Sequence, residues 1–212
     1  MVLRFLLILL MLLLPAPGSV AAEQSPQELV ELAEAEFAAG RVEESIAAFD
    51  RLVALVPSIA PTLWQRGIAL YIAGRHAECA AQFRSFYAED PGDLENATWH
   101  FLCVARAESA ERARAGLLKA GPDSRILRQQ IYEMAGGQRT PEQLLDLAQK
   151  SVDLVQFYGY LYAGLYMDAT GNRVTAAALL TTAASERYDP YGGFMNVVAK
   201  VYVGRLRKMH GQ

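Results

Sequence analysis

The 212-residue sequence contains little cysteine and little histidine, and few of its charges are clustered. The only cysteines, Cys79 and Cys103, are too few for a disulfide framework, so we expect a hydrophobic core to hold the fold together. The two cysteines either form one disulfide or remain buried thiols. We favour buried thiols, because small apolar residues suit the contacts between helices.

Residues suited to metal binding or catalysis are also scarce. His76, His100 and His210 lack a second ligand at metal spacing, and HExxH and CxxC motifs are absent. The sequence has no G-x-S-x-G, P-loop or G-x-G-x-x-G motif either. We therefore expect no metal, no cofactor, no small-molecule substrate and no enzymatic activity. The alternative is an enzyme that uses Cys103 with His100, or one whose chemistry lies in residues 124–155, although no third group is evident to orient the Cys–His pair.

A basic face is missing from the sequence. The chain has 20 basic and 23 acidic residues, and its net charge is −3. Basic residues are clustered only in the short segment 205–208. Because nucleic-acid binding depends on a dense basic surface, we expect no nucleic-acid partner.

One hydrophobic run is present, at residues 5–14. It is too short to cross a membrane, which takes about 20 residues. Two prolines and a glycine then interrupt it, and the small residues at 20–22 suit a signal peptidase. We predict that residues 1–22 are a cleaved export signal and that the protein is periplasmic or secreted. The alternative is an uncleaved N-terminal anchor that tethers the protein to a membrane.

The stretch from Trp64 to Pro91 repeats the pattern found 34 positions earlier. The matching positions are Ala33 with Gly67, Gly40 with Gly74, Glu44 with Glu78, Phe49 with Phe83, and Pro57 with Pro91. Each copy reads as a helix, a glycine turn and a second helix. A helix–turn–helix unit with a period of about 34 residues is typical of stacked helical repeats.

The rest of the sequence is also helical in pattern. No stretch of alternating β-branched residues predicts a strand, so we expect an all-α fold. Ser25 and Thr140 each precede a proline and have Glu28 or Gln143 three residues later, which predicts capped helix starts. We expect one domain at 23–212, with repeats at about 26–59, 60–93, 94–122 and 157–190, a helical insert at 124–155 and a capping helix at 192–208.

These features resemble the tetratricopeptide repeat family. The resemblance rests on the 34-residue period, the seven-residue spacing from a small residue to the turn glycine, the aromatic residue of the second helix and the closing proline. It covers 26–91 best, then 157–190 and 94–122, and leaves 124–155 unexplained. It implies a right-handed superhelix whose first helices line a concave groove for a peptide or protein, without catalysis. With an export signal the chain is similar to exported adaptors of this family, but it lacks the cysteine that carries their lipid.

The first helices supply candidate groove residues. Trp64, Ile68 and Tyr71 share one helix face, because they are spaced four and three residues apart. We expect a groove for a protein or peptide partner, in which the aromatic side chains supply contact area and an arginine pairs with a ligand carboxylate. The expected groove residues are Trp64, Ile68, Tyr71, Trp99, Arg106, Leu161, Leu165 and Asp168, with Cys103 beside them. The alternative is that Trp64 and Trp99 pack between repeats.

A tyrosine stripe at Tyr158, Tyr162 and Tyr166 has two interpretations. We favour packing against the insert or the last helix, and the alternative is a second aromatic binding patch. Taken together, the sequence predicts an exported scaffold that binds a protein or peptide. Self-assembly through the groove or the last helix is a further hypothesis.

Overall fold

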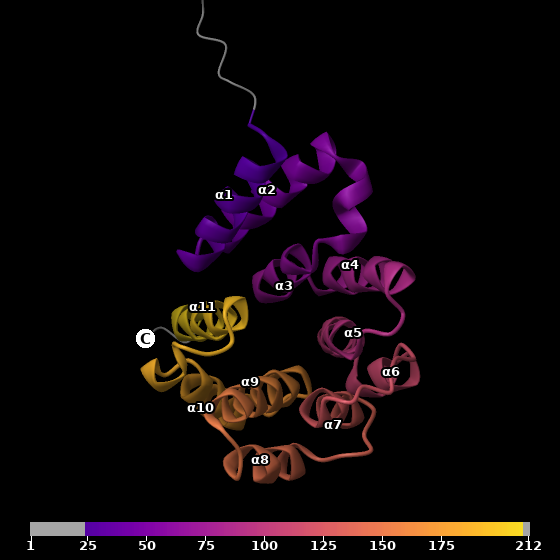
Figure 1. The fold of residues 1–212 in the computed structure, drawn as a ribbon, viewed down its shortest axis with the longest axis vertical. Helices are drawn as coiled ribbons and strands as arrows, with labels where there is room; N and C mark the ends of the chain where they lie inside the picture. Colours follow the sequence, from indigo (N-terminus) through magenta and orange to yellow (C-terminus); the bar gives the residue numbers. More distant parts are fainter. Residues whose placement is uncertain (1–23, 210–212) are drawn as a thin grey trace, which may run out of the picture.

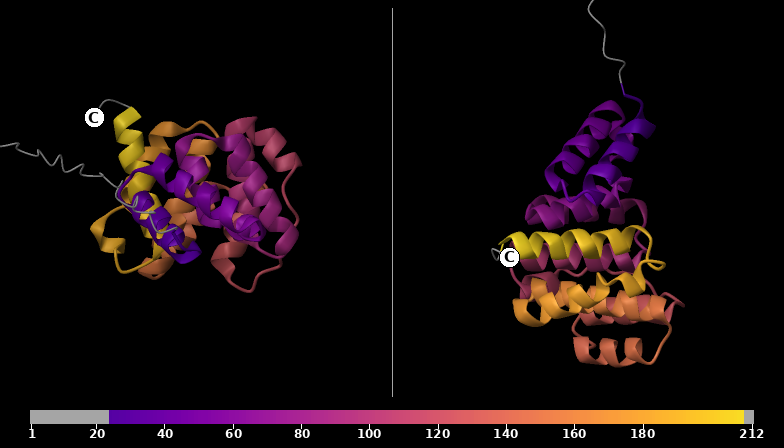
Figure 2. Two further views of the ribbon diagram at one scale, coloured as in Figure 1. Left: turned by 90° about the horizontal axis from the view of Figure 1, so that it is seen from above. Right: turned by 90° about the vertical axis from the view of Figure 1, so that its left-hand side faces the viewer.

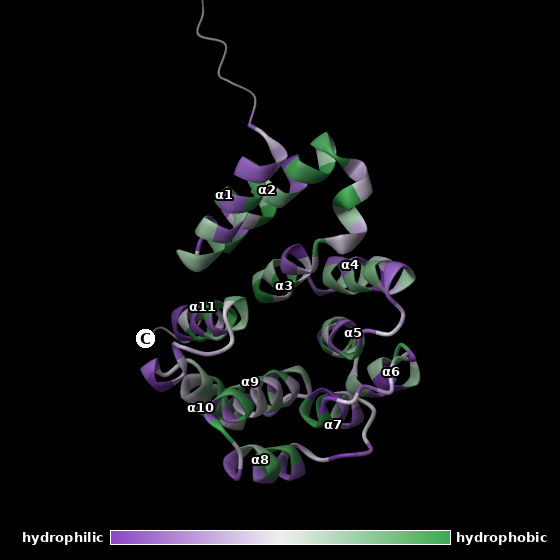
Figure 3. Ribbon diagram, in the orientation of Figure 1, coloured by the Kyte–Doolittle hydropathy of each residue, from purple (hydrophilic) through white to green (hydrophobic). Residues whose placement is uncertain are grey.

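The computed structural model describes residues 24–209, and within that range the fold is all helical, without a strand. The all-α prediction is therefore confirmed. The helices in chain order are α1 (Pro26–Ala38), α2 (Val42–Leu55), η1 (Pro57–Thr62), α3 (Trp64–Ala73), α4 (His76–Glu89), α5 (Leu94–Ala107), α6 (Ala110–Ala115), α7 (Ile126–Ala135), α8 (Pro141–Gln149), α9 (Asp153–Ala169), α10 (Arg173–Ala183), η2 (Glu186–Tyr188) and α11 (Phe194–Met209). Each α-helix carries both hydrophobic and hydrophilic residues (Figure 3). The predicted export signal lies outside the described residues and stays a prediction.

Two helix starts form as the sequence predicts. At α1, the Ser25 hydroxyl accepts a hydrogen bond from the Glu28 amide at 3.3 Å, and the Glu28 carboxylate accepts one from the Ser25 amide at 2.7 Å. Thr140 and Gln143 make the same reciprocal pair at α8. Both capping boxes satisfy backbone amides that a helix start leaves without partners.

Turn glycines end three helices. Gly40, Gly74 and Gly171 have φ angles of 74°, 84° and 99°, in the left-handed region that favours glycine. Each turn reverses the chain, so that α1 packs on α2, α3 on α4, and α9 on α10. The repeated glycines of the sequence therefore mark helical hairpins.

Close packing in two of these hairpins depends on a glycine in the first helix, Gly67 of α3 and Gly164 of α9. An alanine Cβ at Gly164 of α9 would lie 2.7 Å from Leu180 Cγ and 3.2 Å from the Leu180 backbone nitrogen. We expect Gly164→Ala to lower the free energy of unfolding by about 1–3 kcal/mol, because the two helices must separate. Chemical denaturation measures the change.

Gly204 of α11 is the matched control for this substitution. A Cβ added there meets no atom within 4 Å. Gly204→Ala should raise stability by about 0.5–1 kcal/mol, since alanine favours the helix. Equal effects of the two substitutions would contradict close packing at Gly164.

The predicted insert forms helices α7 and α8, which are part of the helical stack. α7 packs against α5 and α9, and α8 packs against α9. The preceding helix is short: α6 ends at Ala115, although the predicted repeat extends to residue 122. The Lys119 carbonyl instead accepts a hydrogen bond from the Tyr87 hydroxyl at 2.8 Å, and the Leu118 carbonyl accepts one from Tyr132 at 3.0 Å. These bonds hold 116–120 in a non-helical path.

The last helix returns to the start of the chain (Figures 1 and 2). α11 packs on α10, as expected of a capping helix, but it also contacts α1 and α3. The Phe194 ring stacks on Phe37 of α1 and meets Trp64 of α3 edge-on, both with ring centroids 5.2 Å apart. Arg205 pairs with Glu43 at 3.3 Å. Helices α3, α5, α7, α9 and α11 consequently form a central ring, seen nearly end-on in Figure 1.

The interior of this ring is the main hydrophobic core. One continuous cluster of buried side chains extends from Phe37 of α1 to Val203 of α11. A smaller, separate cluster between α1 and α2 includes Leu29, Phe49 and Leu52. Among residues 24–209, no helix has the length and apolar character needed to cross a membrane.

Candidate functional site

The predicted groove residues point into the ring, where the protein's own helices cover them. Six of the eight are buried: Ile68, Tyr71, Trp99, Leu161, Leu165 and Asp168. Trp64 and Arg106 are partly buried. Trp64 and Trp99 line an open cleft that is described below. The expectation of an open groove is corrected for the other six residues, which do not line that cleft. α9 and α11 occupy the space next to α3 and α5, so these side chains contact one another.

Arg106 and Asp168, both predicted to face a ligand, form an ion pair with each other. Arg106 Nη1 lies 3.0 Å from Asp168 Oδ2, and the hydroxyl of Tyr202 donates to the same oxygen. Burial, together with the Asp168 charge, raises the pKa of the Tyr71 hydroxyl nearby. The carboxylate that the arginine was expected to recognise is thus supplied by the same chain, and the cluster joins α5, α9 and α11.

The two cysteines are bonded to each other. Cys79 of α4 and Cys103 of α5 form a disulfide with their Cα atoms 5.7 Å apart, and both are fully buried. This overturns our preference for two buried thiols. Pairing follows from packing, because α4 and α5 lie side by side and bring both side chains to one contact.

This disulfide removes the free thiol that the alternative enzyme hypothesis requires at Cys103, to act with His100. The Cys103 sulfur is bonded, so it cannot act as a thiolate. His100 Nε2 lies 3.1 Å from Arg84 Nη2, and because arginine only donates hydrogen bonds, this nitrogen accepts. Burial, assisted by the Arg84 charge, lowers the pKa of His100 to about 4, so the imidazole is neutral at pH 7.

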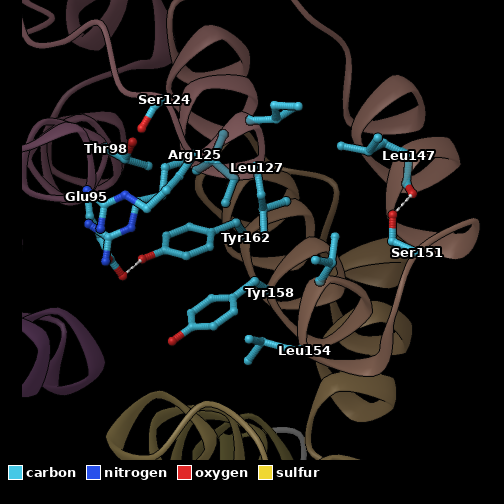
Figure 4. A pocket seen from close by; sticks show the side chains of 14 residues that line it. Glu95, Thr98, Ser124, Arg125, Leu127, Leu147, Ser151, Leu154, Tyr158 and Tyr162 are labelled. Atoms are coloured by element: carbon cyan, nitrogen blue, oxygen red, sulfur yellow. Dashed lines mark hydrogen bonds and ion pairs between the residues drawn. The ribbon is translucent and has the colours of Figure 1, made fainter.

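An open cleft is lined by residues of all five helices of the ring and consists of two cavities. The larger, of about 570 Å³, lies between α5, α7, α8 and α9, and we call it the apolar lobe (Figure 4). The smaller, of about 420 Å³, lies between α3, α4, α5 and α11, and we call it the aromatic lobe. The lobes meet at Glu95, Arg128 and Tyr158, which line both. The apolar side chains of the first lobe are Ile126, Leu127, Ile131, Leu147, Leu154 and Val155. The aromatic side chains of the second are Trp64, Phe83, Phe86, Trp99, Tyr158 and Phe194.

A polar cluster stands at the junction of the lobes. The Tyr162 hydroxyl donates to Glu95, and Arg128 Nη2 lies 3.2 Å from the other oxygen of Glu95. The Tyr158 ring stacks on Tyr162, with both hydroxyls pointing the same way (Figure 4). Burial first, then the Glu95 charge, raises the pKa of both tyrosines. Both hydroxyls therefore remain protonated at neutral pH and can donate hydrogen bonds.

The tyrosine stripe fits both of its interpretations in part. Tyr166 stacks on Phe101 at 5.7 Å and accepts a hydrogen bond from Arg114 at 2.7 Å, so it packs inside the fold. Tyr162 is buried as well. Tyr158 is partly exposed and lines the cleft, where its hydroxyl has no hydrogen bond within the described chain.

Sequence reasoning missed the apolar lobe, because most of its walls belong to the unexplained insert. Ile126 and Leu154, on its rim, are 67% and 43% exposed, which is unusual for large aliphatic side chains. The available signal was the apolar residues on the two non-consensus helices. No group of three or more histidine, cysteine or acidic side chains in the described part of the chain could hold a metal ion.

Comparisons with protein families and characterised proteins found no match for this chain. No protein-family model matches the chain. No characterised protein matches it either. The chain is accordingly defined as an all-α protein with a two-lobed cleft.

Proposed function

We propose that this protein is a non-enzymatic scaffold that holds a protein or peptide partner in the two-lobed cleft. The observation that supports this best is the apolar lobe, with Ile126 and Leu154 exposed on its rim. Large apolar side chains around a concave site are typical of surfaces that a partner covers. The proposed binding surface is thus the two-lobed cleft, which includes Trp64 and Trp99 but none of the other predicted groove residues.

The sequence pattern supports a relation to the tetratricopeptide repeat family. The helical hairpins at α1–α2, α3–α4 and α9–α10 each contain a turn glycine in the left-handed conformation. Members of that family hold peptides and proteins without catalysing a reaction. With residues 1–22 as an export signal, the proposed scaffold works in the periplasm or outside the cell, or is tethered at the membrane if the signal stays uncleaved.

Substitution of a rim residue tests the proposed site. We expect Ile126→Asp to reduce partner capture at least tenfold, because it places a charge where the partner buries an apolar group. Stability should change by no more than about 0.5 kcal/mol, since the side chain is largely exposed. A photoactivatable amino acid at position 126, used in the producing cell, identifies the partner by mass spectrometry, and quantitative pull-down measures the loss.

Val174 of α10 provides the matched control. It is an aliphatic side chain that is 85% exposed and does not line the cleft. Cross-linking from position 174 should miss the partner, and Val174→Asp should leave capture unchanged. Equal capture by the Ile126 and Val174 variants would contradict the cleft as the binding site. Cross-links that join two copies of this chain would indicate self-assembly instead.

A further inference from the structure

The aromatic lobe is lined mainly by aromatic side chains, whereas the apolar lobe is lined mainly by aliphatic ones. Two aromatic pairs line it: Trp64 with Phe194, at 5.2 Å between centroids, and Phe83 with Trp99, at 5.9 Å. These side chains come from α3, α4, α5 and α11, so the lobe exists only because α11 returns to α3. Aromatic faces carry partial negative charge and attract cations.

A residue that lines the same lobe has a buried hydrogen-bond acceptor without a partner. Asn96 is 4% exposed, and its Nδ2 donates to the Phe83 carbonyl at 3.1 Å. This bond fixes the amide orientation, so that Oδ1 is left as an acceptor with no partner in the described chain. Several buried side-chain polar atoms among residues 24–209 have no hydrogen-bond partner. Of these atoms, only Asn96 Oδ1 belongs to a residue that lines the cleft. An orphan acceptor is satisfied by a ligand N–H or O–H group.

The charges around the lobe favour a positive ligand. Asp93 and Glu95 both line it, and Arg128 neutralises only Glu95. Asp93 Oδ1 accepts the backbone amides of Glu95 at 2.8 Å and Asn96 at 3.3 Å, so the positive end of α5 is already compensated. The charge of Arg125 acts on Asp93, but Arg125 is paired with Asp123, and Asp93 itself takes part in no ion pair within the described residues.

From these observations we infer that the aromatic lobe binds an alkyl cation that carries N–H groups, namely the arginine or lysine side chain of the partner. The inference rests on the proposed function for the identity of the partner. The partly exposed rings of Trp64, Phe86 and Phe194 contact the cation, while Phe83 and Trp99 are buried behind them. Asn96 Oδ1 accepts one of its N–H groups, and Asp93 balances its charge. The neighbouring apolar lobe takes an aliphatic side chain of the same partner.

The binding test needs no partner, because the only two tryptophans of the chain, Trp64 and Trp99, both line the aromatic lobe. Tryptophan fluorescence of the purified protein is titrated with n-butylguanidinium, n-butylammonium, n-pentanol and pentanoate. We expect saturable changes with the two cations, at dissociation constants at least tenfold below those of the neutral and anionic probes. Equal or tighter binding of pentanol or pentanoate, or no saturable change with either cation, would overturn the inference.

Two variants locate the bound cation. Asp93→Asn keeps a residue that caps α5 but removes its charge, and we expect affinity for butylguanidinium to fall at least threefold. Asn96→Leu removes the acceptor and should have a similar effect, whereas Asp146→Asn, on the solvent side of α8, should have none. Unchanged affinity in both lobe variants, with circular dichroism showing that they fold, places the cation elsewhere. Cross-linking of a partner from position 126 without cation binding would reject this inference and leave the proposed function standing.

Discussion

Replacing Asp168 with alanine is expected to lower the free energy of unfolding by about 3 kcal/mol. Asp168 is 3% exposed and accepts hydrogen bonds from both Arg106 and Tyr202. Its removal leaves Arg106, whose side chain is 23% exposed, without its counter-charge, and the Tyr202 hydroxyl without its acceptor. A loss of this size is a large part of the roughly 5–15 kcal/mol that holds a typical domain together. Urea denaturation followed by circular dichroism measures it.

Asp146 supplies the comparison for this substitution. It pairs with Lys150 one helical turn away on α8, and both side chains are well exposed. Exposed pairs of this kind contribute about 0.3–0.5 kcal/mol, so Asp146→Ala should change stability little. If the two alanine variants unfold at the same urea concentration, the buried ion pair does not stabilise the closed ring.

Reduction of the disulfide is the second change with a large expected effect. Cys79 and Cys103 are separated by 24 positions, and breaking their bond restores conformational freedom to that loop in the unfolded chain. The expected loss of stability is about 3 kcal/mol. Denaturation with and without a phosphine reductant measures the loss, and mass analysis of the alkylated protein confirms that both sulfurs were bonded.

A double Cys79→Ala, Cys103→Ala variant checks that the reductant acts on this bond alone. Its stability should be the same with and without reductant. A wild-type protein that alkylates fully without prior reduction would show that the two sulfurs are not joined.

The helical hairpins could be predicted because their signals are local. Ser25 with Glu28 defines a helix start over three residues, and the glycines at 40 and 74 define turns. A spacing of 34 residues then relates one hairpin to the next. The capping and turn signals act within one helix or one turn, and the repeat is visible as a fixed spacing along the sequence.

The closed ring and most of the cleft, apart from Trp64 and Trp99, could not be predicted, because they depend on contacts between distant residues. Arg106 meets Asp168 across 62 positions, and Arg205 meets Glu43 across 162. The sequence pattern placed Arg106 and Asp168 in a groove for a ligand and did not reveal that they pair with each other. The disulfide was missed for the same reason, since helical spacing gives the face of each cysteine and not the angle between two helices.

The contact between Phe37 and Phe194 has a consequence for biosynthesis. The ribosome releases α1 early and α11 last, at roughly 5–20 residues per second. Phe37 is consequently synthesised on the order of ten seconds or more before Phe194, whose ring covers it. During translation the first hairpin presents an uncovered hydrophobic face, and a chain that terminates before residue 194 never covers it.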